Sequence, residues 1–358
     1  MKMHLAKILC IAVGLAALCP TARAQQADSA KKVVRYTHQP LISSMYTADP
    51  SAHVFNGKIY IYPSHDINTG KPNTNGDHFD MQDYHILSLD KVGARVKDHG
   101  VALRLSDVAW AERQLWAPDV AFKSGKYYLY FPARDREGIF RTGVATSKSP
   151  SGPFVAEKNY IAGSFSIDPA VFQEKDQTTY MYFGGLWGGQ LQKWTNGSYN
   201  ANEERKDVRK ADEPALGPKV ARLDAGMLKF AEAPKEILIL DEHGKPLLTG
   251  DHERRFFEGA WVFKFKETYY FTYSTGDTHK IVYATGNSPY GPFNYQGIIL
   301  KPVSGWTTHH SILEFEGKWY IFYHDTQLSG KNHLRNIKMA PLEISADGKI
   351  STLDPFKS

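Results

Sequence analysis

Four carboxylates and a pair of histidines stand at matching positions in five similar segments of this 358-residue chain. Each segment has a polar or acidic residue, a short apolar stretch, a turn, and then an alternating run rich in aromatic residues. The residues at the matching positions are Asp49, Asp119, Asp168, Glu258 and either His309 or His310. Carboxylates that converge in a fold repel one another, so the pKa of some of them rises. Such a group suits acid–base chemistry, because one carboxyl can hold a proton while another stays ionised.

Each of the five segments is typical of a β-hairpin. Two stretches flank an Asn-Gly, Ser-Gly or Glu-Gly turn, or a longer polar turn, and the second stretch is rich in Tyr and Phe. The segments are "ADPSAHVFNGKIYIY" from Ala48, "APDVAFKSGKYYLYF" from Ala117, "SIDPAVFQEKDQTTYMYF" from Ser166, "FEGAWVFKFKETYYFTYS" from Phe257 and "HHSILEFEGKWYIFYH" from His309. Their spacing is irregular but close to the length of a four-stranded blade with its loops. The pattern predicts an all-β fold, a five-bladed β-propeller in which the first strand of each blade lines a central axis.

Residues 1–24 have the features of a signal peptide: basic residues, a short apolar run and an Ala-Arg-Ala motif that ends at Ala24. The apolar run is too short to span a bilayer. Both cysteines, Cys10 and Cys19, lie within this leader, so the mature chain is expected to fold without disulfides. We therefore expect an exported protein, periplasmic or secreted, in which residues 25–358 form a single domain.

The charge pattern argues against nucleic-acid and membrane partners. The formal net charge of +5 includes three basic residues of the leader, and no Lys/Arg cluster is interleaved with aromatic residues. No second apolar segment suggests a membrane span. Asp77, Asp80 and Asp83 stand three positions apart, but the glycine and terminal glutamate of an EF-hand loop are missing, which favours a solvated turn. The sequence contains no HExxH, phosphate-loop or GxSxG motif.

The five segments together resemble glycoside hydrolase family 43, whose members are five-bladed propellers that remove arabinose or xylose from plant polysaccharides. The motifs that carry the resemblance are "ADPS" at Ala48, "WAPDV" at Trp116, "SIDPAVF" at Ser166, "FEGAW" at Phe257 and "THHSI" at Thr308. The resemblance extends over essentially all of the mature chain. It implies a catalytic trio in which Asp49 is the general base, Glu258 is the general acid, and Asp168 raises the pKa of the acid and orients it.

Glycoside hydrolysis has a physical need for such a trio. The leaving oxygen must receive a proton while an activated water attacks the other face of the sugar, so one carboxyl holds its proton and another stays ionised. The family inverts the anomeric centre. The resemblance therefore implies a separation of roughly 6.5 to 9.5 Å between base and acid, which leaves room for the water.

Two polar side chains carry further implied roles. Arg335, in "HLRNIKM", resembles an arginine that hydrogen-bonds sugar hydroxyls near the base. His309 resembles a histidine near an axial metal, a structural calcium ion held largely by waters, since calcium prefers oxygen ligands. Thr308 replaces the glycine that usually precedes this histidine, which leaves open whether His309 or His310 faces the axis.

Aromatic residues and one more carboxylate complete the candidate set. Trp116, Trp187 and Trp261 either stack on sugar rings or pack in the core, because aromatic faces serve both purposes. Asp119 stands in a position equivalent to those of the trio. We expect its side chain to accept backbone N–H groups between blades rather than take part in chemistry.

The resemblance implies an inverting exo-glycosidase, an α-L-arabinofuranosidase or β-D-xylosidase acting on plant cell-wall polysaccharide or oligosaccharide. Alternatives within the family are an endo-acting arabinanase and an exo-galactanase. The alternative of another class is a non-catalytic sugar-binding propeller. Loops 65–80 and 186–202 are expected to decide whether the site is a closed pocket or an open cleft. The sequence leaves the oligomeric state open.

Overall fold

The computed structural model of the protein describes residues 34–74, 76–276 and 278–357. Residues 35–358 form one compact unit. The predicted signal peptide, residues 1–24, lies outside the described residues. Within the described part of the chain, no helix has the length and apolar character needed to cross a membrane.

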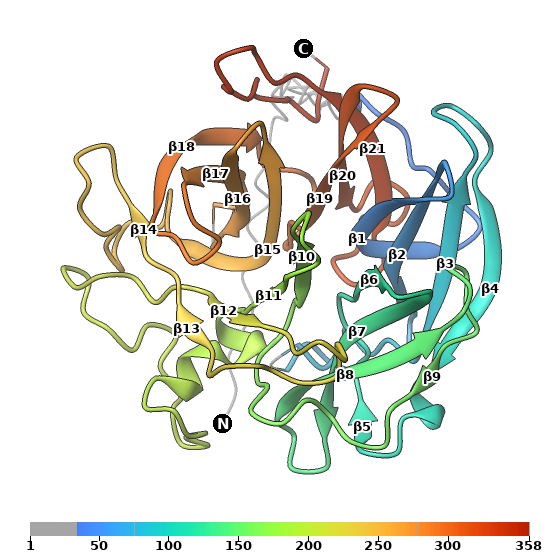
Figure 1. Ribbon diagram of the computed structural model, residues 1–358, viewed down its shortest axis with the longest axis horizontal. Coiled ribbons are helices and arrows are strands. Elements are labelled where there is room, and N and C mark those ends of the chain that lie inside the picture. Colours follow the sequence, from blue (N-terminus) through green and yellow to red (C-terminus); the bar gives the residue numbers. More distant parts are fainter. Residues whose placement is uncertain (1–33, 75, 277, 358) are drawn as a thin grey trace, which may run out of the picture. The chain divides into compact units, whose positions relative to one another are not determined.

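The described residues form five sheets, which are arranged as blades around a central axis (Figure 1). The first blade contains β1 (Tyr46–Phe55), β2 (Lys58–Asp66), β3 (Asp83–Leu89) and β4 (Lys97–Arg104). The second contains β6 (Asp119–Lys123), β7 (Lys126–Asp135), β8 (Phe140–Ser147) and β9 (Val155–Ala156), with β5 (Ala111–Arg113) also paired to β7. The third contains β10 (Ala170–Gln173), β11 (Thr179–Phe183), β12 (Lys219–Arg222) and β13 (Lys235–Glu236).

The last two blades depart slightly from the four-stranded form. The fourth contains β15 (Phe256–Phe265), β16 (Thr268–Thr275), β17 (Ile281–Gly286) and β18 (Phe293–Leu300), with β14 (Ile239–Leu240) parallel to β18. In the fifth, the described strands are β19 (His310–Phe315), β20 (Lys318–Asp325) and β21 (Asn336–Leu342). Short 3-10 helices cover Leu105–Asp107, Trp187–Gly189 and Leu191–Trp194.

The innermost strand of every blade is the first strand of a predicted hairpin. The inner strands β1, β6, β10, β15 and β19 contact one another in that order, and β19 contacts β1. The ring is therefore closed, which confirms the predicted five-bladed β-propeller. Three predicted hairpin turns have positive φ at both central residues, as type I′ turns require: Asn56-Gly57, Ser124-Gly125 and Glu316-Gly317.

The N-terminal segment joins the last blade. Pro40 forms a bridge with Lys338 on β21, and the N–H of Leu41 donates to the carbonyl of Ile337 at 2.9 Å. Tyr36 forms a second bridge, with Phe356 near the C-terminus. The two ends of the unit are thus held together beside the fifth blade, which helps to keep the ring closed.

The apolar core lies between the blades. Five clusters of buried apolar residues occur in the described part of the chain, and each joins strands of neighbouring blades. Residues 127–131 of β7 are all buried, because this strand has a neighbouring blade on each face. The aromatic load of the sequence fills these interfaces and leaves the polar residues at the inner strands to face the axis.

Candidate active site

A cavity of about 1010 Å³ contains most of the predicted site residues in its wall. Those residues are Asp49, Trp116, Asp168, Trp187, Glu258, His309 and Arg335. They come from all five blades or from the loops beside them. The propeller therefore brings together side chains that are up to 286 positions apart in the sequence.

Asp49 lies on β1 where the strand is irregular. Its φ is +48°, and the pairing of β1 with β2 shifts register between Ala48 and Ser51. This irregularity frees its backbone N–H, which donates to Nδ1 of His324 at 3.0 Å. The carboxylate accepts hydrogen bonds from Ser64 at 2.7 Å and from Arg335 at 3.0 Å. An aspartate is thus accommodated in a strand because the strand is interrupted around it and its polar atoms have partners.

Arg335 controls the ionisation of Asp49. Its Nε and Nη2 donate to the two carboxylate oxygens of Asp66, each at 2.8 Å, and its Nη1 donates to Asp49 and to Thr307. Burial by itself would raise the pKa of Asp49, but the charge of Arg335 and the hydrogen bond and charge of His324 together outweigh burial and hold that pKa well below its ordinary value. Asp49 is therefore ionised, as a general base must be. The implied contact of Arg335 with sugar hydroxyls stays a prediction.

Glu258 has the opposite environment. It lies on β15, where the pairing with β16 shifts register on both sides of it, and its side chain is partly exposed to the cavity. Burial and the nearby charge of Asp49 raise the pKa of Glu258 to about 8. Glu258 therefore holds its proton at neutral pH. Two carboxyl groups on one cavity wall thus have pKa values displaced in opposite directions, the usual sign of an acid and a base.

Asp168 connects the third blade to the backbone that carries Glu258. It lies two residues before β10 with a φ of +57°, and its Oδ2 accepts the N–H of Gly259 at 3.0 Å. Burial, together with the charges of Glu258 and Asp49, raises the pKa of Asp168 well above its ordinary value. The position beside Glu258 is the one that an orienting residue needs, and its role in catalysis stays a prediction.

Of the two adjacent histidines, His309 borders the cavity. Its Nε2 lies 3.8 Å from Oδ2 of Asp168, and neither ring nitrogen has a hydrogen-bond partner among the described residues. Burial lowers the pKa of His309 to about 4, so its ring is neutral. His310 turns away into the fourth blade, where its Nε2 lies 2.6 Å from Oγ1 of Thr272. The structure therefore resolves the choice that the sequence left open.

The three candidate tryptophans separate into two groups. Trp116 and Trp187 line the cavity. The ring of Trp187 lies across Phe257, with centroids 4.9 Å apart, and nearly parallel to that of Trp306. Trp261 is different, because it is 6% exposed and packs in the core between the fourth and fifth blades, with its indole N–H donated to the carbonyl of Ile312. The structure places Trp261 in packing rather than sugar binding, because its ring is buried against His53 of β1 and does not line the cavity.

Asp119 has the structural role expected of it. It is 1% exposed and accepts the backbone N–H of Val120 at 2.7 Å and that of Val171 at 2.5 Å. Ser51 and His53 of β1 also contact its carboxylate. Asp119 therefore links the inner strands of the first three blades.

The residues that surround Asp49 were missed by the sequence analysis. Ser64 and Asp66 lie at the end of β2, and His324 lies at the end of β20. These residues close the second strand of a hairpin, whereas the matching positions in the sequence repeat begin the first strand. A signal was present, because the aromatic runs "YIYPSHD" and "YIFYHD" both end in polar residues.

A five-bladed propeller whose cavity holds an ionised and a protonated carboxyl, bordered by tryptophans, has the site of a glycoside hydrolase. The sequence model of Glycosyl hydrolases family 43 matches residues 37–350. The chain belongs to this family.

Relatives and solved structures with similar sequences come from the same family. A xylosidase/arabinosidase of Bacteroides ovatus is 55% identical over 88% of this chain and 97% of its own length. A beta-xylosidase of Xylanibacter ruminicola is 49% identical over 87% of this chain and 97% of its own length. The crystal structure of CoXyl43, a GH43 beta-xylosidase/alpha-arabinofuranosidase from a compost microbial metagenome, superposes with a TM-score of 0.89. It is 60% identical, covers 91% of this chain and 100% of its own, and contains xylotriose in a calcium-free form.

Proposed function

We propose that this enzyme is an inverting, exo-acting glycoside hydrolase that releases xylose or arabinose from plant cell-wall oligosaccharides and polysaccharides. The observation that carries the proposal is the opposite displacement of the pKa values of Asp49 and Glu258 on one cavity wall. A non-catalytic sugar-binding propeller has no need for a protonated and an ionised carboxyl in one cavity.

The proposed reaction follows from these two protonation states. Glu258 donates its proton to the glycosidic oxygen as the bond to the anomeric carbon breaks. Asp49 accepts a proton from the water that attacks the opposite face of that carbon. The products are the inverted sugar and the shortened alcohol, and exchange with solvent returns each carboxyl to its starting state. Arg335 and Ser64 hold Asp49 in place during this cycle.

The choice of sugar rests on the relatives. The relatives that are 49% to 57% identical carry the names xylosidase/arabinosidase and beta-xylosidase. A GH43_1 enzyme of Xanthomonas citri, 55% identical with a TM-score of 0.85, was crystallised with xylotriose. This supports xylose-containing oligosaccharides as substrates. It favours the xylosidase/arabinosidase assignment over arabinanase and galactanase.

The loops around the cavity support exo action. Residues of both predicted specificity loops line it, among them His78 and Phe79 from the first loop and Tyr199 and Ala201 from the second. Trp187 and Trp306 stand close together on the same wall. We infer from these loop contributions that the cavity binds a chain end rather than a chain interior.

The substrate is tested with nitrophenyl β-D-xyloside, nitrophenyl α-L-arabinofuranoside, xylotriose and linear arabinan, with the length of every product recorded. We expect hydrolysis of both nitrophenyl glycosides and release of only monosaccharide from xylotriose. Release of oligosaccharides from arabinan would replace exo action by endo action. Binding of xylotriose without turnover would support the non-catalytic alternative.

We also infer a calcium ion near His309. The two buried ring nitrogens of His309, which have no hydrogen-bond partner in the part of the chain that the structure describes, lie beside the carboxylate of Asp168 and fit a site completed by ordered waters. His309 would hold the ion directly or through water. The ion would supply positive charge beside the axial carboxylates.

Removal of metal with EDTA is expected to lower kcat/KM, and CaCl2 is expected to restore it in the wild type and not in His309→Ala. Full activity in an enzyme shown by elemental analysis to lack calcium would overturn this inference.

A further inference from the structure

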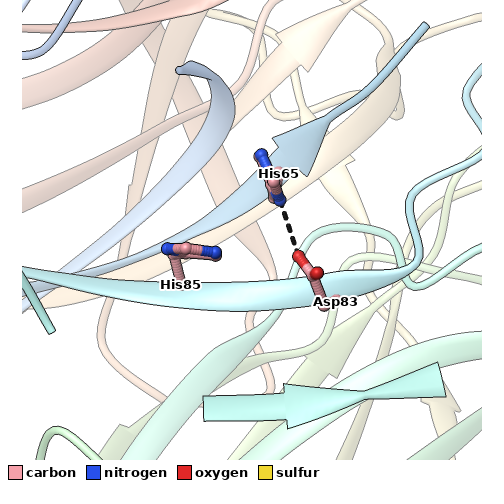
Figure 2. Close-up of side chains that lie close together, drawn as sticks. All are labelled: His65, Asp83 and His85. Atoms are coloured by element: carbon pink, nitrogen blue, oxygen red, sulfur yellow. Dashed lines mark hydrogen bonds and ion pairs between the residues drawn. The ribbon is translucent and has the colours of Figure 1, made fainter. Parts of the chain in front are cut away.

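A second group of metal-ligating side chains lies on the first blade. His65, Asp83 and His85 each offer one ligand atom, and these atoms all lie within 4.8 Å of one another. Of the described residues that line the active-site cavity, none belongs to this group. Figure 2 shows the three side chains projecting from two adjoining strands to the same side of the sheet. They form a small polar cluster separate from the axial site.

The strands place the three side chains together. His65 is on β2, and Asp83 and His85 are on β3, two residues apart, so the last two project from one face of the sheet. Nδ1 of His65 lies 2.6 Å from Oδ1 of Asp83, and the rings of His65 and His85 have centroids 4.8 Å apart. Pairing of β2 with β1 and of β3 with β4 holds the backbone of these three residues in place without a metal.

A fourth residue orients His85. Nδ1 of His85 lies 3.0 and 3.1 Å from the two carboxylate oxygens of Asp98, on β4. Its Nε2 is therefore the nitrogen left for a ligand. A carboxylate that holds one nitrogen of an imidazole while the other binds a metal is the usual outer-shell arrangement of protein zinc sites.

The aspartate series in this region does not form the EF-hand type of site considered for the sequence. Asp80 is 4% exposed and pairs with Lys71 at 2.9 Å, while Asp77 lies 3.9 Å from Arg134. The expected solvated turn is therefore wrong for Asp80, which is buried. Asp83 alone of the series joins the two histidines.

We propose that His65, Asp83 and His85 form a binding site for a divalent transition-metal ion, with zinc as the best-fitting ion and Asp98 as the residue that orients His85. Two imidazoles and one carboxylate match the ligand preference of zinc, and a water can take the fourth position. Calcium is disfavoured, because it prefers a set of oxygen ligands.

The geometry needs only small movements to accept the ion. Zinc bonds of about 2.0 to 2.2 Å in a tetrahedron place ligand atoms a little over 3 Å apart. The contact between His65 and Asp83 must therefore lengthen by less than about 1 Å, and His85 must move closer. The side chains of His65, Asp83 and His85 are 19%, 24% and 15% exposed, so they can rotate and the ion can enter from solvent.

The ion would act on the first blade near the active site. It would link β2 to β3 one residue before Asp66, which holds Arg335 with two hydrogen bonds. The ion would therefore have a structural role and would stabilise the strand that carries Asp66. It does not depend on the sugar specificity proposed above.

The test uses the untagged full chain, stripped with a chelator and titrated with ZnCl2, with bound metal measured by calorimetry and elemental analysis. His309→Ala is the background, because it removes the axial histidine. We expect one zinc per chain in this background and its loss in His65→Ala and in His85→Ala. Asp98→Asn is expected to keep the site with affinity lowered roughly 10- to 100-fold. His243→Ala is the matched control, since His243 contacts Glu242 at 3.9 Å and is 73% exposed.

Cobalt absorption and thermal unfolding provide two further measurements of the site. CoCl2 should give the visible absorption of a four-coordinate site in the background protein and not in the His65→Ala or His85→Ala variants. ZnCl2 should raise the Tm of the background protein and leave the Tm of those variants unchanged. Circular dichroism of the metal-free variants establishes that each is folded. Equal zinc binding in all variants, or no zinc binding by the background protein, would overturn the proposal and leave His65 and Asp83 as an ordinary ion pair.

Discussion

Replacing Glu258 with glutamine is expected to lower kcat/KM for xylotriose by up to roughly 10⁴-fold, the upper range for the loss of a general acid. Glutamine has nearly the same shape, but its amide cannot release a proton to the leaving oxygen. The loss should be smaller for nitrophenyl β-D-xyloside, because nitrophenolate leaves without protonation. Parallel measurement of the two substrates separates a defect in proton donation from a general defect in the site.

The pH dependence of kcat/KM provides a second test of Glu258 as the acid. Glu258 has a pKa of about 8, so the wild-type enzyme carries the proton below that pH and loses it above. Its kcat/KM for xylotriose should therefore fall as the pH rises through about 8, by about tenfold per pH unit. The glutamine variant should lack this decline with the nitrophenyl substrate. Glu267→Gln is the control, because Glu267 is 84% exposed in the turn between β15 and β16. Unchanged turnover of xylotriose in Glu258→Gln would exclude Glu258 as the acid.

Replacing Asp49 with asparagine is expected to lower kcat/KM by roughly 10²- to 10⁴-fold on activated and unactivated substrates alike. The attacking water must lose a proton whatever the leaving group is, and an amide cannot accept that proton. The equal loss on both substrates distinguishes this variant from Glu258→Gln. Initial rates on xylotriose and nitrophenyl β-D-xyloside provide the comparison.

Stability must be checked alongside these rates. Asparagine removes the negative charge that Arg335 contacts in a buried site, although Asp66 still binds the guanidinium with two hydrogen bonds. Thermal unfolding of Asp49→Asn shows whether the protein remains folded at the assay temperature. Asp90→Asn on the same blade is the control, because Asp90 is 73% exposed. A folded Asp49→Asn enzyme with the wild-type rate would remove Asp49 as the base.

Much of the fold was predictable because its signals are local. The hairpins follow from alternating residues around short turns, and Asn56-Gly57 has the positive φ values that such a turn needs. The position of Asp49, Asp168 and Glu258 on one cavity wall was also predictable, once the repeat suggested a propeller and the motifs suggested its family. Once the five segments are taken as equivalent blades of a propeller, the residue at the matching position of each segment is placed at the central axis.

Arg335 was expected near the base from its motif, but the other contacts that surround Asp49 were not predictable by that reasoning. Arg335 and Asp66 are 269 positions apart, and Asp49 and His324 are 275 apart. Ring closure between the first and last blades creates both contacts. Trp261 was a wrong prediction of a different kind. Its place in the "FEGAW" motif suggested sugar binding, but in the structure it lies in the core, with its indole N–H donated to the carbonyl of Ile312.

The sequence by itself determined the five hairpins, the repeated acidic position and the family motifs, because each of these is written in residues close together in the chain. Only the tertiary structure decided which carboxyl is ionised, which histidine faces the cavity and which tryptophan is buried. Those properties depend on burial and on charges brought together from distant blades, and a pKa is set by what surrounds a group in space. Asp49 and Asp119 make the point: both are aspartates that begin a hairpin, and their surroundings make one accessible to a substrate and the other a structural link.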